Sequence, residues 1–171
     1  MSGERRDFSG RPGEPALRGV DAPAGEQPQT MKKERILIVD DDAGMRRMLA
    51  RILAPLGHEV LSAENAEAAF AIATAEGVDL IISDLKMPDM DGLALLRRLR
   101  EEGLDAAFIL LTAFGELDTV LSARDRYELS NFFVKPILSQ DKFLFDVITA
   151  LRKRHLELEN RRLIEALAKA N

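Results

Sequence analysis

The chain has 171 residues, of which 46% are hydrophobic and 31% are charged, which is ample for one globular domain with a core and short for two. Its net charge of -5 argues against a direct nucleic-acid surface, which normally shows as a basic excess on one face. The absence of cysteine excludes disulfides and thiolate metal sites, and no apolar stretch approaches the ~18 residues of a membrane span. We therefore expect a cytoplasmic protein.

The first 30 residues are rich in Gly and Pro and show no apolar periodicity. Such a segment cannot bury enough surface to offset the entropy lost on ordering, so residues 1–32 are predicted to form a disordered tail. The ordered pattern begins after Met31, and translation from Met1 or from Met31 is equally consistent with the sequence.

From Arg35 onward, a short apolar strand followed by a helix recurs five times, with strand starts near residues 35, 58, 79, 106 and 131. This period predicts an α/β fold with a doubly wound, five-stranded parallel sheet of order 2-1-3-4-5, the flavodoxin-like arrangement. Between the strands, apolar stripes predict helices over about 43–56, within NAEAAFAIATAEG, over 92–102 and over 116–128. Glycines end the first three of these helices.

The last helix is predicted to begin near Ser139, a suitable N-cap, and to run on because residues 139–171 contain neither Gly nor Pro. Leu156, Leu163 and Leu167, with Asn160 between them, recur at the 4-3 spacing of a short coiled coil. A solvated or frayed helical tail explains so short a pattern equally well. We therefore expect one domain over 33–154 and a helical extension over 155–171.

The stretch from Asp79 to Gly92, DLIISDLKMPDMDG, delivers Asp84 to the end of a buried strand, where open α/β sheets bind ligands. Taken alone, an Asp before such a loop is ordinary turn chemistry. The other strand ends carry further polar residues: Asp40 and Asp41, Thr112, and Lys135. Their joint occurrence at one edge of the sheet is what indicates a site.

Asp40, Asp41 and Asp84 at neighbouring strand ends would repel one another and raise their pKa values unless a cation lay among them. A hard divalent ion is the natural occupant, and Mg²⁺ prefers oxygen ligands and leaves positions for a phosphoryl oxygen. With the cluster neutralised, Asp84 can attack phosphorus as a nucleophile and hold an aspartyl phosphate. Thr112 and Lys135 can then stabilise charge on the phosphoryl oxygens.

The motifs ILIVDDD, SDLKMPDMDG, LLTAFG and FFVKP resemble those of the receiver domain of two-component response regulators, over about residues 33–154. The resemblance implies a phosphorelay signalling domain rather than an enzyme. It implies that a sensor histidine kinase or a histidine phosphotransfer protein phosphorylates Asp84.

The resemblance also assigns the metal ligands and the switch residues. It implies that Mg²⁺ is bound directly by Asp41, Asp84 and the backbone carbonyl of Lys86, while Asp40 contributes mainly through water. Phe132 matches the switch aromatic of the family, which turns inward as the switch residue Thr112 moves toward the phosphoryl group.

The signal is expected to leave through a surface that changes on phosphorylation, since the chain shows no catalytic or DNA-binding output. The predicted switch surface is the face over residues 112–155, formed by the fourth helix, the fifth strand and the last helix. A homodimer through that face or through the C-terminal helix, or a separate protein partner, are open alternatives. The segment RDRYELSN departs from the small Gly/Ala segment common in the family, which indicates an unusual recognition surface.

Two alternatives compete with this hypothesis. A phosphatase resembling the haloacid dehalogenase superfamily is suggested by Asp40, Asp42 and Gly44, which nearly fit an Asp-x-Asp-x-Thr/Val start. Gly44 stands where Thr or Val belongs, and we assign Asp42 to a helix N-cap instead. The other alternative is a pseudo-receiver scaffold that is never phosphorylated, against which the complete set of polar strand ends argues.

Overall fold

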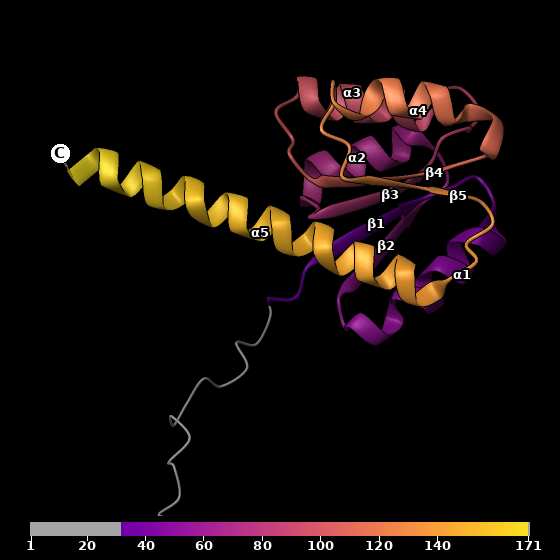
Figure 1. Cartoon of the computed structure of the whole chain (residues 1–171), viewed down its shortest axis with the longest axis horizontal. Helices are drawn as coiled ribbons and strands as arrows, with labels where there is room; N and C mark the ends of the chain where they lie inside the picture. Colours follow the sequence, from indigo (N-terminus) through magenta and orange to yellow (C-terminus); the bar gives the residue numbers. More distant parts are fainter. Residues whose placement is uncertain (1–31, 171) are drawn as a thin grey trace, which may run out of the picture. The chain divides into compact units, whose positions relative to one another are not determined.

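The computed structural model describes residues 32–170, so the prediction of a disordered tail over residues 1–32 lies, except for Lys32, outside the described part of the chain. Five parallel strands form one sheet of order β2-β1-β3-β4-β5, as the sequence predicts (Figure 1). They are β1 (Arg35–Val39), β2 (Glu59–Ala63), β3 (Leu80–Asp84), β4 (Ala107–Thr112) and β5 (Asn131–Val134). Each begins within one residue of its predicted start.

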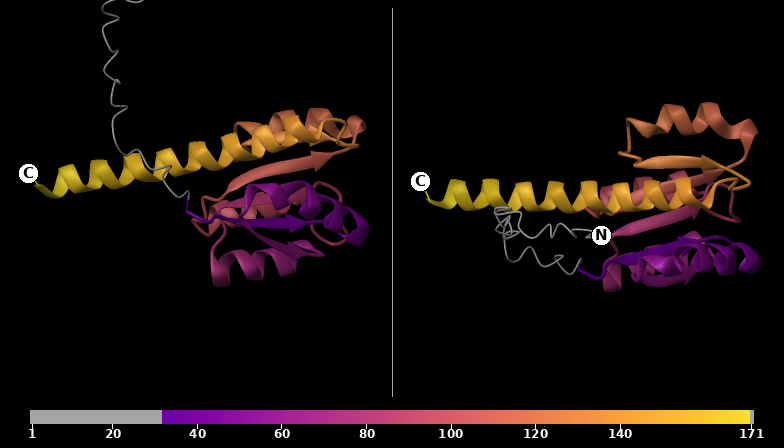
Figure 2. Two further views of the ribbon diagram at one scale, coloured as in Figure 1. Left: turned by 90° about the horizontal axis from the view of Figure 1, so that it is seen from below. Right: turned by 60° about the horizontal axis from the view of Figure 1, so that its bottom comes forward.

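Helices cover both faces of the sheet. On one face lie α1 (Ala43–Leu53) and α5 (Gln140–Ala170), and on the other lie α2 (Ala66–Glu76), α3 (Gly92–Glu101) and α4 (Leu117–Arg124) (Figure 1 and Figure 2). Short 3₁₀ turns, η1 (Ala54–Leu56) and η2 (Phe114–Glu116), follow α1 and precede α4. This is the predicted doubly wound fold, in which the carboxyl ends of all the strands lie along one edge.

The core has two layers because side chains alternate along the central strands. On β1, Leu37 and Val39 pack toward α2 and α3, whereas Ile36 and Ile38 pack toward α1 and α5. All four side chains have 0% exposure. Burying one such side chain contributes about 1.5–3 kcal/mol. The buried strands therefore hold the edge at their carboxyl ends in place.

Side-chain caps fix where helices begin. Asp42, Asn65 and Asp91 cap α1, α2 and α3, each accepting a hydrogen bond from a backbone N–H in the first turn at 2.7–2.8 Å. The assignment of Asp42 to an N-cap is thus confirmed. Gly57, with φ +73°, ends the first helical stretch as predicted, since glycine adopts this left-handed conformation without steric cost.

The fourth helix is shorter than predicted. It ends at Arg124, and the prediction of a helix as far as residue 128 is wrong. Glu128 has φ +54°, and the N–H of Leu129 bonds to the carbonyl of Arg124 at 3.2 Å, so the chain turns there. The turn buries Leu129, which is 5% exposed, and lets Ser130 bond to the β4 carbonyl of Phe108 at 2.9 Å. Burial and strand pairing thus outweigh local helix propensity.

The last helix, α5, is a continuous helix of 31 residues, as predicted from the absence of Gly and Pro. Ser139 caps it by accepting a hydrogen bond from the N–H of Lys142 at 3.2 Å. Its first half packs on the sheet, and its second half runs past the sheet (Figure 1). Within the described residues, no helix combines the length and the hydropathy needed to cross a membrane.

Candidate functional site

Four strand ends meet at one edge of the sheet. Asp40 follows β1, Asp84 is the last residue of β3, Thr112 is the last residue of β4, and Lys135 follows β5. The N–H of Lys135 donates to the carbonyl of Thr112 at 2.8 Å, and equivalent backbone pairing joins the ends of β3 and β4. The sheet therefore sets the relative positions of these side chains before any loop contributes.

Three carboxylates cluster at this edge. Asp40, Asp41 and Asp84 each offer an oxygen, and these oxygens lie within 4.8 Å of one another. Asp40 and Asp84 are buried, while Asp41 is exposed. The cluster is therefore exposed to solvent on the side of Asp41, whereas Asp40 and Asp84 lie inside the protein.

The ionised form of Asp40 is disfavoured by its position in this cluster. Burial raises the pKa of its carboxyl above 3.8, and the nearby charges of Asp84 and Asp41 raise it further. The backbone N–H of Asp42, which donates to Oδ1 at 2.9 Å, acts in the opposite direction, as does Lys135. The buried Oδ2 atom has no hydrogen-bond partner among the described residues.

The donors of the cluster fit a hard divalent cation. All three groups are carboxylates, which are the ligands that such ions prefer, and the buried Oδ2 of Asp40 has an unused lone pair. A cation there would offset the repulsion that raises the pKa of Asp40. The prediction that Asp40, Asp41 and Asp84 come together is confirmed.

Lys135 reaches into the cluster from β5. Its Nζ atom lies 2.8 Å from Oδ1 of Asp84 and 3.9 Å from Oδ2 of Asp40. An ammonium at this distance neutralises part of the negative charge on Asp84 and lies where it can contact a group bonded to that carboxylate. The structure thus brings Lys135 to the position expected from the sequence.

Thr112 contacts a residue that sequence reasoning missed. Its Oγ1 atom lies 3.0 Å from Oε2 of Glu116 and 3.2 Å from the carbonyl of Ala113. The other Glu116 oxygen pairs with Nζ of Lys86 at 2.8 Å, and this hydrogen bond lowers the pKa of Glu116. We call Thr112, Glu116 and Lys86 the threonine latch. The only sequence signal for it is the spacing of four residues between Thr112 and Glu116.

Gly92 allows α3 to begin directly against the strand that carries Asp84. A Cβ atom at Gly92 would lie 2.5 Å from the carbonyl oxygen of Asp84 and 2.8 Å from Cδ1 of Leu110. The N–H of Gly92 donates to the carbonyl of Leu85 at 2.8 Å, which closes the loop after β3. Nothing in the motif DLKMPDMDG by itself indicates this packing requirement, which depends on the distance between α3 and β3.

Phe132 lies on β5, half-buried against the core layer that includes α2, α3 and α4. Lys86 is exposed, with 81% of its side chain accessible, and its ammonium is directed to Glu116. These positions are compatible with the expected roles of Phe132 as a switch and of the Lys86 carbonyl as a ligand. Both roles remain predictions.

Comparison with known proteins identifies the family. The model of the response regulator receiver domain matches residues 36–148. The chain belongs to this family. It is a receiver domain, a phosphoacceptor of two-component signalling, with Asp40, Asp41 and Asp84 in its acidic pocket.

Individual relatives of this receiver agree with the assignment. The chain is 35% identical over 130 residues to sporulation initiation phosphotransferase F of Bacillus subtilis (strain 168), covering 76% of this chain and 99% of that protein. It is 36% identical over 106 residues to the probable transcriptional regulator ycf27 of Porphyridium aerugineum, covering 62% of this chain and 43% of that protein. The chain thus spans less than half the length of the second relative.

A solved structure agrees with the fold. The crystal structure of a response regulator receiver domain protein from Clostridium thermocellum matches with a TM-score of 0.66 at 26% identity, over 72% of this chain and 98% of that one. The phosphatase alternative is correspondingly disfavoured. Asp42, which that hypothesis needs in the site, caps α1 through hydrogen bonds to Gly44 and Met45.

Proposed function

We propose that Asp84 of this receiver accepts a phosphoryl group from a phosphohistidine of a sensor kinase or phosphotransfer protein in a Mg²⁺-dependent reaction. The observation that carries this proposal is the position of Asp84, inside the acidic cluster and 2.8 Å from the Lys135 ammonium. Of the acids in the cluster, Asp84 is the one that Lys135 contacts most closely.

The chemistry is a transfer from nitrogen to oxygen. One Asp84 carboxylate oxygen forms a bond to phosphorus while the bond between phosphorus and the donor imidazole breaks, and the imidazole leaves with a proton from solvent. Lys135 would move its ion pair from the carboxylate to a phosphoryl oxygen. Mg²⁺, held by Asp41, Asp84 and the Lys86 carbonyl with Asp40 nearby, would supply charge neutralisation for the incoming phosphoryl group.

A phosphotransfer role is supported by the relative that this chain covers almost completely. That protein is named a phosphotransferase. By analogy, this receiver would exchange its phosphoryl group with protein partners, and this exchange would take place in the cytoplasm. We assign it to residues 33–154 and regard residues 155–171 as a separate interaction segment.

The response would begin at the threonine latch. A phosphoryl group on Asp84 competes with Glu116 for the hydroxyl of Thr112, and movement of Thr112 opens space for Phe132. The face over residues 112–155 exposes large apolar side chains, including Phe114 at 77%, Leu121 at 50% and Leu138 at 92%. Such exposure supports a protein-binding surface, for a partner or for a second receiver.

The test is transfer of labelled phosphate from a phosphohistidine donor. The parent protein should be labelled in Mg²⁺ and not in chelator, and Asp84→Asn should abolish labelling. Asp89→Asn is the matched control, because Asp89 lies in the same loop, is exposed, and has φ +72°, which Asn tolerates. Labelling of the Asp84→Asn protein would refute the assignment, and steady release of phosphate from small esters would favour a phosphatase.

A further inference from the structure

The part of α5 beyond the sheet has a line of exposed apolar side chains. Leu156, Leu163 and Leu167 are 54%, 57% and 68% exposed, and Ile164 beside them is 67% exposed. Single exposed leucines are common, but a line of them on one helix side is the mark of a surface that packs against something.

This line lies on a side of α5 that its own domain does not cover. The 4-3 spacing of the leucines sets the heptad positions, with Leu156 and Leu163 at d and with Lys153, Asn160 and Leu167 at a. The residues that pack on the domain then occupy positions b, e and f: Phe143, Val147, Ala150, Leu151 and Arg154. Positions b and f lie away from a and d, and e borders them, so the domain covers one flank of α5. The a and d residues beyond the sheet, which we call the seam, stay accessible, since Leu156, Leu163 and Leu167 are more than half exposed.

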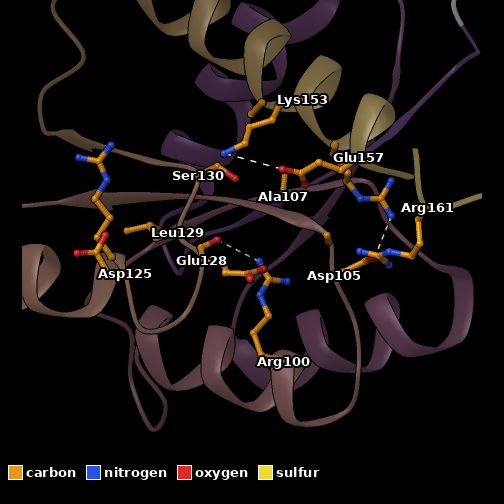
Figure 3. Close-up of a pocket in the computed structure, with 14 residues that line it drawn as sticks. Arg100, Asp105, Ala107, Asp125, Glu128, Leu129, Ser130, Lys153, Glu157 and Arg161 are labelled. Atoms are coloured by element: carbon orange, nitrogen blue, oxygen red, sulfur yellow. Dashed lines mark hydrogen bonds and ion pairs between the residues drawn. The ribbon is translucent and has the colours of Figure 1, made fainter. Parts of the chain in front are cut away.

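Ion pairs hold this orientation. Arg154 lies 2.7 Å from Asp79 and 3.4 Å from Asp105, and Arg161, one heptad later at the same b position, lies 3.1 Å from Asp105. Figure 3 shows Arg161 and Asp105 directed toward each other beside a cavity of about 460 Å³ at the amino edge of the sheet. The charged b residues therefore face the domain, and the seam points outward.

We propose that the α5 extension pairs, parallel and in register, with the same helix of a second copy of this chain. The proposal does not rest on phosphoryl transfer. The seam is complementary to itself in this arrangement, because d leucines meet d leucines and Asn160 at position a meets its counterpart, which favours two strands in one register.

Charge also favours the parallel pairing. In a parallel dimer, a g residue of one helix lies beside the e residue five positions later in the other, so Arg152 of one copy meets Glu157 of the second. An antiparallel pair would place a positions against d positions, with Asn160 against leucine and Arg152 away from Glu157. The pairing of Asn160 with its counterpart and of Arg152 with Glu157 therefore both favour a parallel partner of identical sequence. Glu157, which lies 4.0 Å from Lys153 of its own helix, would then contact basic residues of both helices.

The first experiment is sedimentation equilibrium of the full chain from micromolar to millimolar concentration. The seam is short, so we expect a reversible dimer, and Leu163→Glu should raise its dissociation constant by about tenfold or more. Ala168→Glu adds the same charge at an exposed b position and should leave the dimer unchanged. Asp84→Asn should dimerise like the parent, which separates this proposal from the assignment of the phosphoacceptor.

The charge pairing between the two helices and their parallel orientation are tested separately. Arg152→Glu should weaken the dimer, and adding Glu157→Arg should restore it. Because the chain contains no cysteine, Asn160→Cys provides a unique thiol that should form an interchain disulfide under mild oxidation, while Ala168→Cys should not. A parent that stays monomeric, a dimer that tolerates Leu163→Glu, or failure of Cys at position 160 to cross-link would overturn the proposal.

Discussion

Glu116 accepts a hydrogen bond from the hydroxyl of Thr112. A phosphoryl group on Asp84 would need the same hydroxyl. The contact is 3.0 Å, and Lys86 holds the other Glu116 oxygen at 2.8 Å, so the threonine latch joins the loop after β3 to the loop after β4. The latch is partly exposed, and its hydrogen bonds are therefore worth less than a buried set. It defines a resting position for Thr112 without locking it.

The first prediction concerns this latch. Glu116→Ala should free Thr112 and raise the affinity for beryllofluoride in Mg²⁺ by roughly threefold to tenfold, since one charge-assisted hydrogen bond no longer competes. Fluorescence or calorimetric titration would measure this affinity. Asp118→Ala is the control, because it removes an exposed acid from the first turn of the same helix. Equal affinities for Glu116→Ala and the parent protein would show that the latch does not compete.

The second prediction concerns Asp40. Its pKa in the folded protein is raised above 3.8, chiefly by burial and then by its acidic neighbours. The protonated carboxyl therefore favours the folded state below pH 3.8, and this contribution to stability is lost as the pH rises through the folded-state pKa. Asp40→Asn should therefore raise the free energy of unfolding by on the order of 1 kcal/mol at neutral pH in chelator. The gain should disappear as the pH falls toward 3.8. Urea unfolding across pH would reveal either pattern, and an equal gain at every pH would contradict it.

At the scale of elements, the start of α3 and the end of β3 share a space that admits only a hydrogen atom. The Cβ of an alanine at position 92 would lie 2.5 Å from a backbone oxygen, so the strand or the helix would have to move. Because that oxygen belongs to Asp84, any such movement also displaces the acceptor.

The third prediction follows from this close approach. Gly92→Ala should cost about 1–3 kcal/mol of unfolding free energy, as overpacking does, and should slow labelling of Asp84. Gly115→Ala is the matched control, because nothing lies within 4 Å of the added Cβ and its φ is not positive. Denaturant unfolding and phosphotransfer rates would be compared for both. A Gly92→Ala protein with the stability and labelling rate of the parent would contradict the prediction, because it would show that the loop after β3 can move to accept the added Cβ atom.

The sequence predicts the elements whose signal is local. The buried runs of β1, β3 and β4 are apolar on both faces, and caps such as Asp42 stand directly before their helices. The end of α4 could not be predicted, because it depends on the burial of Leu129 under distant elements. Likewise, the contact of Glu116 with Thr112 depends on the 3₁₀ turn between them, which has no clear apolar pattern.

At the scale of the whole molecule, a cation bound to the acidic cluster should raise the free energy of unfolding of the domain. Ligand binding to the folded state alone stabilises it by about 2.7 kcal/mol when the free ligand is at a hundred times its dissociation constant. The clustered carboxylates are not preformed in an unfolded chain, so the condition of selective binding is met.

The fourth prediction is that Mg²⁺ raises the unfolding temperature of the parent protein relative to chelator and fails to do so in Asp41→Ala. Differential scanning calorimetry at several Mg²⁺ concentrations would measure both. Asp89→Asn serves again as the control, since its carboxylate lies outside the cluster. An equal shift in Asp41→Ala would place the ion elsewhere.

The continuity of α5 also has a mechanical consequence. Its first turn follows Lys135 and the phosphoacceptor edge, while its last turns lie beyond the opposite edge of the sheet (Figure 1). At 1.5 Å per residue the helix is about 46 Å long, so tilting it by about 5° would carry its tip by about 4 Å. A tilt too small to reshape the loop at one end would thus become a displacement of several ångströms at the other, so that α5 would act as a lever.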